Sequence, residues 1–262
     1  MNRLDKLFLN DRFAIIFYLT VGEFPREDEL EIIKTLIESG ADCLELGVPF
    51  SDPLADGATI QEAMQISLQR GTSLKDVFDL SKEIRKFSDI PLLLMGYYNP
   101  FYQFGLERLC KVSKEMGIDG FIIPDLPPEE AGELIENTNA RDLRTVFLLA
   151  PTSREERYEV VGKLTSGFIY YVSVKGTTGE RDHLPKDIEE KVPKIKAITG
   201  KPVVVGFGVS HPHQIRWLKG FANGAVIGSA LLRIMKQNKE NKRAMLEAVS
   251  DFVASLANEA RT

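Results

Sequence analysis

Three carboxylates and two prolines share one short segment, residues 45–57, which reads Glu-Leu-Gly-Val-Pro-Phe-Ser-Asp-Pro-Leu-Ala-Asp-Gly. The apolar residues around Glu45 favour a buried strand, so this carboxyl is expected at the strand's end, partly shielded from water. Shielded carboxyls hold their protons to higher pH. The prolines fix φ and remove backbone donors, which gives the loop a defined shape that places Asp56. Two acids in different environments are typical of divided acid and base roles.

Each acid also has a purely structural interpretation that the residues alone leave open. Glu45 could form a salt bridge with a neighbouring strand. Asp56 could cap the following helix, which we expect to begin near Thr59. Asp52, immediately before Pro53, is expected to form a turn.

The elements that must position these acids alternate along the whole chain. Near-continuous apolar runs separated by helical patterns favour an α/β fold with a parallel sheet covered by helices. Eight such units favour closure into one (β/α)8 TIM barrel, and the 262 residues match the ~250 typical of that fold. An open doubly wound sheet is the alternative. No linker divides the chain, so we expect one domain over residues 1–262.

The expected strands are 13–19, 42–46, 91–95, 120–123, 145–149, 168–172, 202–205 and 224–227. The expected helices are 27–38, 74–87, 106–116, 128–139, 154–164, 185–198 and 211–218. Residues 1–12 are expected to form an extra N-terminal helix at the lower end of the barrel.

Two glycine motifs indicate a phosphate site. Residues 206–210 (Gly-Phe-Gly-Val-Ser) follow the seventh expected strand, and residues 228–230 (Gly-Ser-Ala) follow the eighth and open a helix. Phosphates often bind at these two places in such barrels, because backbone N–H groups and a helix N-terminus can approach the anion. The alternative is that these glycines only form turns. The long, polar, glycine-rich segment 173–183 is expected to be a mobile lid.

Composition excludes several function classes. A net charge of -5 without Lys/Arg runs argues against a nucleic-acid partner, and no segment approaches the ~20 apolar residues of a membrane span. The charged N-terminus does not resemble a signal peptide, so a cytoplasmic location is expected. Cys43 and Cys110 are expected to be buried thiols. His211 and His213 are expected in a solvated turn rather than a zinc site.

The segment 45–57, followed by Thr59-Ile60-Gln61, closely resembles the signature of the tryptophan synthase alpha subunit family. The resemblance covers essentially all of the chain. The chain departs from the family's usual pattern at Glu23-Phe24-Pro25, where many relatives carry Asp-Pro, and at Ala58, where proline is common. Further motifs occur in the family's order at residues 19–22, 95–100, 124–127, 150–152, 176–179, 206–208 and 228–229.

The resemblance implies a lyase of tryptophan biosynthesis. Its reaction would be the retro-aldol cleavage of indole-3-glycerol phosphate to indole and glyceraldehyde 3-phosphate, without a metal or organic cofactor. Indole would pass to a beta subunit that carries pyridoxal phosphate, in an α2β2 complex. By this resemblance Glu45 transfers the proton at indole C3, and Asp56 accepts the indole N–H.

The resemblance also implies a substrate pocket. Tyr18 would lie beside the indole and Tyr170 near the reacting end, and Thr178 would reach the loop that carries Asp56. By strand position, Leu94, Tyr97, Asn99 and Ile122 fall near the same pocket. Backbone N–H groups around five residues are expected to hold the phosphate: Gly179, Phe207, Gly208, Gly228 and Ser229.

Three alternatives remain open at this stage. The chain could be a free-standing indole-releasing lyase, a catalytically silent binding subunit, or another phosphate-sugar barrel such as an isomerase. The intact Glu45 and Asp56 argue against the silent subunit, and the match around the first loop argues against the isomerase. A partner surface is expected at Pro53-Leu54 and at the turn 99–101.

Overall fold

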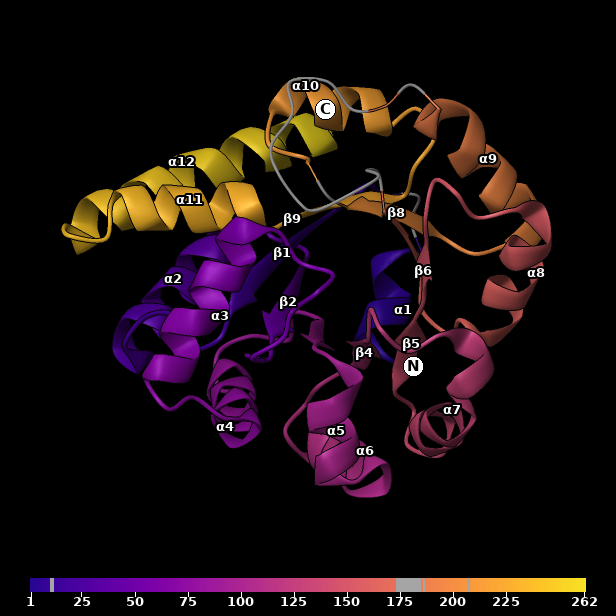
Figure 1. Cartoon of the computed structure of the whole chain (residues 1–262). Helices are drawn as coiled ribbons and strands as arrows, with labels where there is room; N and C mark the ends of the chain where they lie inside the picture. Colours follow the sequence, from indigo (N-terminus) through magenta and orange to yellow (C-terminus); the bar gives the residue numbers. More distant parts are fainter. Residues whose placement is uncertain (10–11, 173–184, 186, 207) are drawn as a thin grey trace.

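The described part of the chain forms a nearly closed barrel of nine parallel strands flanked by helices (Figure 1). The computed structural model describes residues 1–9, 12–172, 185, 187–206 and 208–262. The strands run in the order β5-β4-β3-β2-β1-β9-β8-β7-β6. Their bounds are β1 Ala14–Thr20, β2 Cys43–Gly47, β3 Leu92–Met95, β4 Gly120–Ile122, β5 Arg144–Val146, β6 Leu148–Leu149, β7 Ile169–Val172, β8 Val203–Gly206 and β9 Gly224–Ile227. The predicted TIM barrel is confirmed.

The barrel closes where one expected strand is interrupted. Residues 145–149 were expected as a single strand, and this detail is wrong, because β5 and β6 are separated by Phe147. β5 pairs with β4, whereas β6 pairs with β7. The Phe147 carbonyl accepts a hydrogen bond from the Tyr170 N–H at 3.0 Å. The backbone therefore changes partner at this residue and joins the two ends of the sheet.

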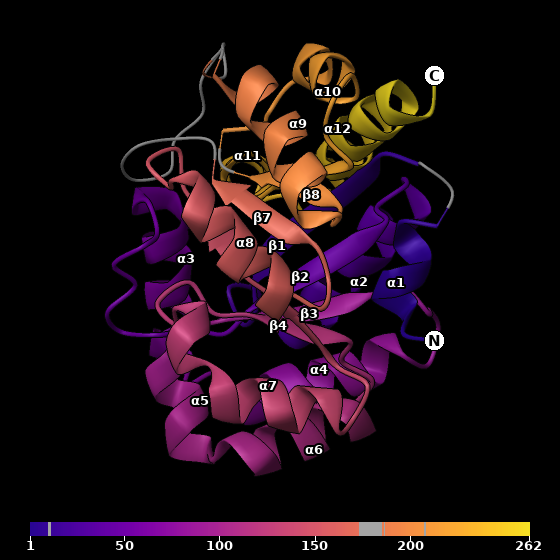
Figure 2. The same cartoon turned by 90° about the vertical axis from the view of Figure 1, so that its right-hand side faces the viewer.

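Helices surround the strands, which is why the strands read as continuous apolar runs (Figures 1 and 2). All seven residues of β1 are buried, since one face meets the barrel interior and the other meets helices. The bounds are α1 Arg3–Leu7, α2 Arg26–Glu38, α3 Ala58–Gln69, α4 Leu74–Ile84, α5 Tyr98–Phe104, α6 Leu106–Glu115, η1 Pro128–Glu130, α7 Gly132–Asn139, α8 Glu155–Leu164, α9 Ile188–Thr199, α10 Pro212–Leu218, α11 Ser229–Gln237 and α12 Lys242–Arg261.

Three helix predictions need correction. The stretch 99–101, expected as a turn, lies in α5, because Pro100 occupies the first helical turn, where a backbone N–H would have no intrahelical partner. The expected helix 128–139 is divided into η1 and α7. The expected N-terminal helix 1–12 is only the short α1, which ends at Leu7.

Polar contacts fasten α1 to the strands. The Asn2 amide donates to the carbonyls of Asp119 and Asp142 at 3.0 and 2.8 Å, and Arg3 pairs with the Asp119 carboxylate at 3.1 Å. Asp119 also accepts from Arg85 at 2.9 Å. These contacts join α1 to the residues that precede β4 and β5.

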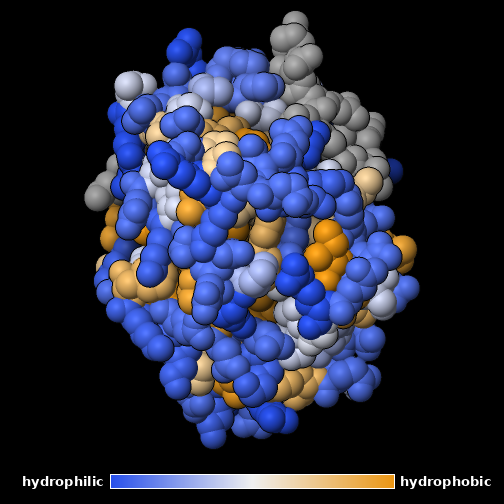
Figure 3. Space-filling model, turned by 90° about the vertical axis from the view of Figure 1, so that its left-hand side faces the viewer, coloured by the Kyte–Doolittle hydropathy of each residue, from blue (hydrophilic) through white to orange (hydrophobic). Residues whose placement is uncertain are grey.

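The outside of the barrel is largely polar. The face that carries α2, α3, α11 and α12 is mostly hydrophilic, with scattered hydrophobic atoms (Figure 3). Cys43 and Cys110 are buried free thiols, as predicted. Within the described ranges, no helix combines the length and the apolar character that a membrane span requires.

Candidate active site

Glu45 lies on β2 with its side chain inside the barrel. Its side chain is 0% exposed, and neither carboxyl oxygen has a hydrogen-bond partner among the described residues. No salt bridge of Glu45 occurs in the described part of the chain either, which removes the structural alternative for this residue. Burial raises the pKa of Glu45 to about 8, so the carboxyl is mainly protonated at neutral pH and can act as a proton donor.

Asp56 lies on the loop between β2 and α3. The loop turns tightly, with the Asp56 N–H donating to the Pro53 carbonyl at 3.1 Å, and the Gln61 amide donating to the Asp56 carbonyl at 2.8 Å. Asp56 does not cap α3, because the N-cap is Gly57 and no side chain bonds there. The carboxylate is instead directed toward Tyr97.

The carboxylate of Asp56 has one engaged and one unengaged oxygen. Its Oδ2 accepts from the Tyr97 hydroxyl at 2.7 Å, and its Oδ1 is buried without a partner in the described structure. Asp56 is only 1% exposed, so its carboxyl is buried. Burial raises the pKa of Asp56 to about 6, and the hydrogen bond from Tyr97 opposes that rise. Asp56 is therefore mainly ionised at neutral pH.

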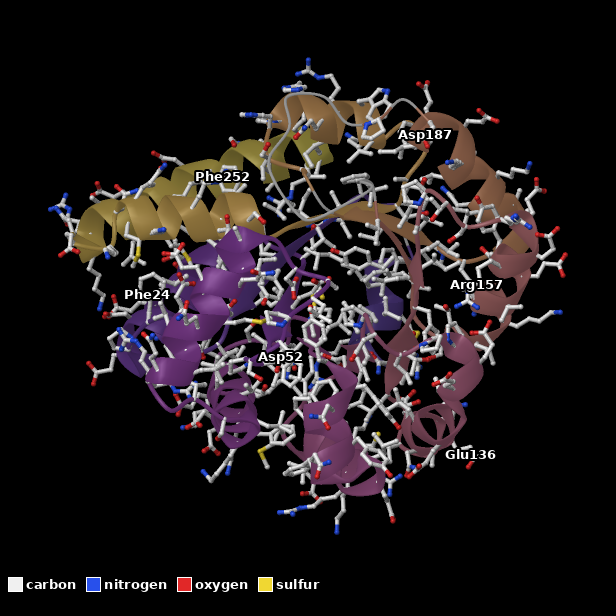
Figure 4. The ribbon with its side chains drawn as sticks, in the orientation of Figure 1. Phe24, Asp52, Glu136, Arg157, Asp187 and Phe252 are labelled. Atoms are coloured by element: carbon white, nitrogen blue, oxygen red, sulfur yellow. The ribbon has the colours of Figure 1, made fainter. Side chains whose placement is uncertain are left out.

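Tyr97 fastens the Asp56 loop to α5. It is the N-cap residue of α5, and its ring stacks on Phe50 with the centroids 5.2 Å apart. Its hydroxyl accepts from the Ala55 N–H at 2.9 Å and donates to Asp56. Burial, followed by the charge of Asp56, raises the pKa of Tyr97 far above its usual range. The loop residue Asp52, by contrast, is exposed (Figure 4).

Two further tyrosines lie over glycines at the ends of strands. A Cβ on Gly47 would overlap the hydroxyl of Tyr18, and a Cβ on Gly206 would overlap that of Tyr170. The Tyr18 hydroxyl shares a hydrogen bond of 3.1 Å with Thr20. Burial raises the pKa of both tyrosines, and the charges of Asp56 and Glu45 raise it further. Both rings thus lie within electrostatic reach of the two acids.

The strand register decides which other residues face the pocket. Glu45 pairs with Tyr18 on one side and with Leu93 on the other, so these three share a face of the sheet. Leu94 therefore lies on the opposite face, and its predicted place in the pocket is wrong. Met95, which the sequence analysis missed, pairs with Gly47 and with Ile122, so Ile122 keeps its predicted inward position. Asn99 is exposed on α5.

The described part of the predicted phosphate site lies at the N-terminus of α11. Gly228 is the N-cap of this helix, and Ser229 is its first residue. A Cβ on Gly228 would meet Tyr18 at 3.4 Å, which places this helix end beside the pocket. Gly208 has φ +87°, a conformation that favours glycine. Thr178, Gly179, Phe207 and the lid segment 173–183 lie outside the described residues.

His213 and Trp217 lie in α10, and His211 is the N-cap of this helix. His211 and His213 are exposed, with ring centroids 5.4 Å apart. In the described ranges, no group of three or more His, Cys, Asp or Glu side chains is placed to hold a metal ion. Trp217 packs edge-on against Phe221 at 4.9 Å.

Comparisons with known proteins agree with this geometry. The family model described as "Tryptophan synthase alpha chain" matches residues 4–261. A curated tryptophan synthase alpha chain from Aquifex aeolicus (strain VF5) is 48% identical over 228 residues, which cover 86% of this chain and 87% of the relative. The alpha chain of Thermoanaerobacter sp. (strain X514) is 41% identical over 260 residues, or 98% of each chain.

The structural similarity is equally extensive. A chain in a structure of the tryptophan synthase α2β2 complex from Pyrococcus furiosus superposes with a TM-score of 0.87 at 39% identity. The match covers 94% of this chain and 98% of that one.

Proposed function

Because this chain belongs to the tryptophan synthase alpha chain family, it is a lyase that cleaves indole-3-glycerol phosphate, and we propose that Glu45 and Asp56 perform the cleavage. One observation carries the proposal: Glu45 on β2 and Asp56 on the following loop are both buried, and each has a carboxyl oxygen without a partner in the described structure. Glu45 has a pKa of about 8 and Asp56 a pKa of about 6. Near pH 7 the pair therefore offers one proton donor and one anion.

Glu45 carries the proton between two atoms of the substrate. Cleavage of the bond from indole C3 to the side chain requires a proton on C3 and loss of the proton from the adjacent hydroxyl. The protonated Glu45 donates to C3 and becomes a carboxylate. That carboxylate accepts the hydroxyl proton as the carbon–carbon bond breaks and the aldehyde forms. The reaction neither gains nor loses a proton overall, and Glu45 returns to its protonated form.

Asp56 stabilises the charge that develops on the indole. When C3 is protonated, positive charge appears on the indole nitrogen, whose N–H then becomes a stronger donor. The partnerless Oδ1 of Asp56 is the acceptor we propose for it. A preorganised anion in a site without bulk water stabilises such charge far more than water does.

The phosphate is proposed to bind at the α11 N-terminus. Gly228→Val adds an isopropyl group at a position where a Cβ alone would meet Tyr18 at 3.4 Å, so it should crowd this helix end. We expect the affinity for glycerol 3-phosphate, measured by calorimetry, to fall at least about tenfold. Gly132→Val is the matched control, because a Cβ on Gly132 meets nothing within 4 Å. Equal affinities of the two variants would place the phosphate elsewhere.

The family works without a cofactor on the alpha chain, and both proposed steps are proton transfers that need none. We propose that pyridoxal phosphate is carried by the beta partner. We also propose that residues 1–262 act as one domain in the cytoplasm and bind neither nucleic acid nor membrane.

A beta subunit is the proposed partner, in an α2β2 complex like the one from Pyrococcus furiosus. The surface proposed for it contains Leu54, which is 88% exposed, and Tyr102, which is 57% exposed. Leu54 lies on the loop that carries Asp56, and Tyr102 lies on α5, which follows Tyr97. Phe101, named in the sequence-based expectation of this surface, is fully buried and packs against Phe121.

Titration with a beta subunit tests this proposal. We expect a complex at micromolar concentrations and a higher kcat for indole release, because a partner that contacts both the Asp56 loop and α5 favours their closed arrangement. Leu54→Asp should weaken the complex, whereas Leu68→Asp, at an exposed position of α3, should not. No association, together with high activity of the isolated chain, would support the free-standing lyase instead.

A further inference from the structure

The motif Pro124-Asp125-Leu126-Pro127 has no role in the reaction described above, yet Asp125 contacts α5 directly. Asp125 is exposed on the loop after β4, and its Oδ1 accepts a hydrogen bond of 2.9 Å from the Tyr98 N–H. Tyr98 is the first residue of α5, whose first N–H groups have no partner within the helix. A carboxylate at that position also interacts favourably with the helix dipole.

The residue before Tyr98 is Tyr97, which holds Asp56. The Ala55 N–H can only donate, so the Tyr97 oxygen accepts from it and the Tyr97 O–H is free to donate to Asp56 Oδ2. This order of donors leaves Asp56 Oδ1 as the unengaged oxygen. The Tyr98 N–H therefore donates to Asp125, and the hydroxyl of the preceding residue, Tyr97, donates to Asp56. Two consecutive residues at the start of α5 thus connect the two carboxylates.

We propose that Asp125 is a positioning residue, which orients the Asp56 carboxylate through the N-terminus of α5 and the Tyr97 hydroxyl. The proposal rests on the function proposed for Asp56. Without Asp125 the first turn of α5 loses its acceptor, and Tyr97 can move away from the loop. Asp56 would then lose the bond that selects which oxygen faces the substrate. Small displacements of a group that must meet a reacting atom are costly in rate.

Kinetics of Asp125→Ala, Tyr97→Phe and the double variant, each with its beta partner, test this inference. We expect Asp125→Ala to lower kcat about tenfold with little change in KM. Asp125→Asn retains an oxygen acceptor and should recover most of the lost kcat. The double variant should be no slower than Tyr97→Phe alone, because residues that act through one contact are not additive. Glu130→Ala, at a nearby exposed carboxylate on η1, is the matched control.

The pH profile gives a readout that a purely structural residue would not change. The groups that interact with Asp56 are Tyr97 at the N-cap of α5, Tyr18 on β1 and Tyr170 on β7. Of these, Tyr97 is the donor that favours the Asp56 anion. Loss of the Tyr97 hydroxyl should therefore raise the pKa of Asp56, and the acid limb of the kcat/KM profile should move to higher pH. Asp125→Ala should move this limb in the same direction, and Glu130→Ala should leave it in place.

Two outcomes would overturn the inference. One is an Asp125→Ala effect that adds fully to that of Tyr97→Phe. The other is a lower melting temperature with kcat and the acid limb unchanged, which would make Asp125 a helix cap only. Failure of the proposed function is a separate result, since it would appear as an active Asp56→Asn variant measured in parallel.

Discussion

Glu45→Gln is expected to lower kcat for indole release by ~10²–10⁴-fold, the usual size of a general acid–base contribution, while the substrate still binds. Glutamine has nearly the same shape as protonated glutamic acid, but it cannot release and recover a proton. Because Glu45 has no hydrogen-bond partner in the described structure, the substitution breaks no existing contact. Glu136→Gln, on the outer helix α7, is the matched control (Figure 4). Wild-type kcat in the Glu45 variant would exclude this role.

The same variant should be more stable than the wild type at alkaline pH. The pKa of Glu45 is about 8 in the folded chain and about 4.5 in the unfolded one, so the folded state holds a proton that the unfolded state releases. The stability from this carboxyl is complete below pH 4.5 and is lost as pH rises through 8. Urea unfolding should give similar stabilities at pH 4.5, and a difference on the order of a few kcal/mol at pH 9.

This comparison separates chemistry from folding. Glu23 and Glu29 are also buried with raised pKa values, but both variants contain them, so their contributions cancel. An inactive variant that is also more stable cannot owe its inactivity to unfolding. Equal stability of the two proteins at pH 9 would mean that the Glu45 carboxyl is not desolvated.

The apolar runs of the sequence predict most of the fold, because parallel strands that are buried on both faces consist of nearly continuous apolar residues. The interruption at Phe147 could not be predicted, since the residues on both sides remain apolar and nothing local states which neighbouring strand the backbone pairs with. The helical state of residues 98–104 was missed for a different reason. Proline is typical of turns, although it is also compatible with a first helical turn, where Pro100 lies.

The two acids could be predicted from one loop, but their surroundings could not. Tyr97 and Asp56 are 41 residues apart in the chain, so only the fold reveals their hydrogen bond. That contact gives the buried Asp56 carboxylate a hydrogen-bond donor. Leu94 and Met95 show a second limit, since a change of one residue in strand register reverses the face that a side chain occupies. Hydrophobicity alone does not distinguish these two neighbours.

Asp56→Asn is the second variant with a large expected effect, on the order of 10²–10³-fold in kcat. The amide is neutral and cannot balance the positive charge on the indole nitrogen. The hydrogen bond from Tyr97 makes the substitution worse, because the Tyr97 hydroxyl donates and the amide oxygen must turn toward it. The amide NH₂ would then face the indole N–H, donor against donor. Asp52→Asn, on the same loop but exposed, should retain wild-type kcat.

The pH dependence of kcat/KM distinguishes a charge-stabilising Asp56 from one that only binds substrate. Asp56 protonates as pH falls through about 6, and Glu45 loses its proton as pH rises through about 8, so the wild-type profile should be bell-shaped between these values. Asp56→Asn should lose the acid limb and keep the alkaline one. Since the charge on the indole exists mainly in the transition state, KM should change less than kcat. A variant with normal kcat and raised KM would instead make Asp56 a substrate-binding residue, and the stabilisation of the indole cation would have to come from another group.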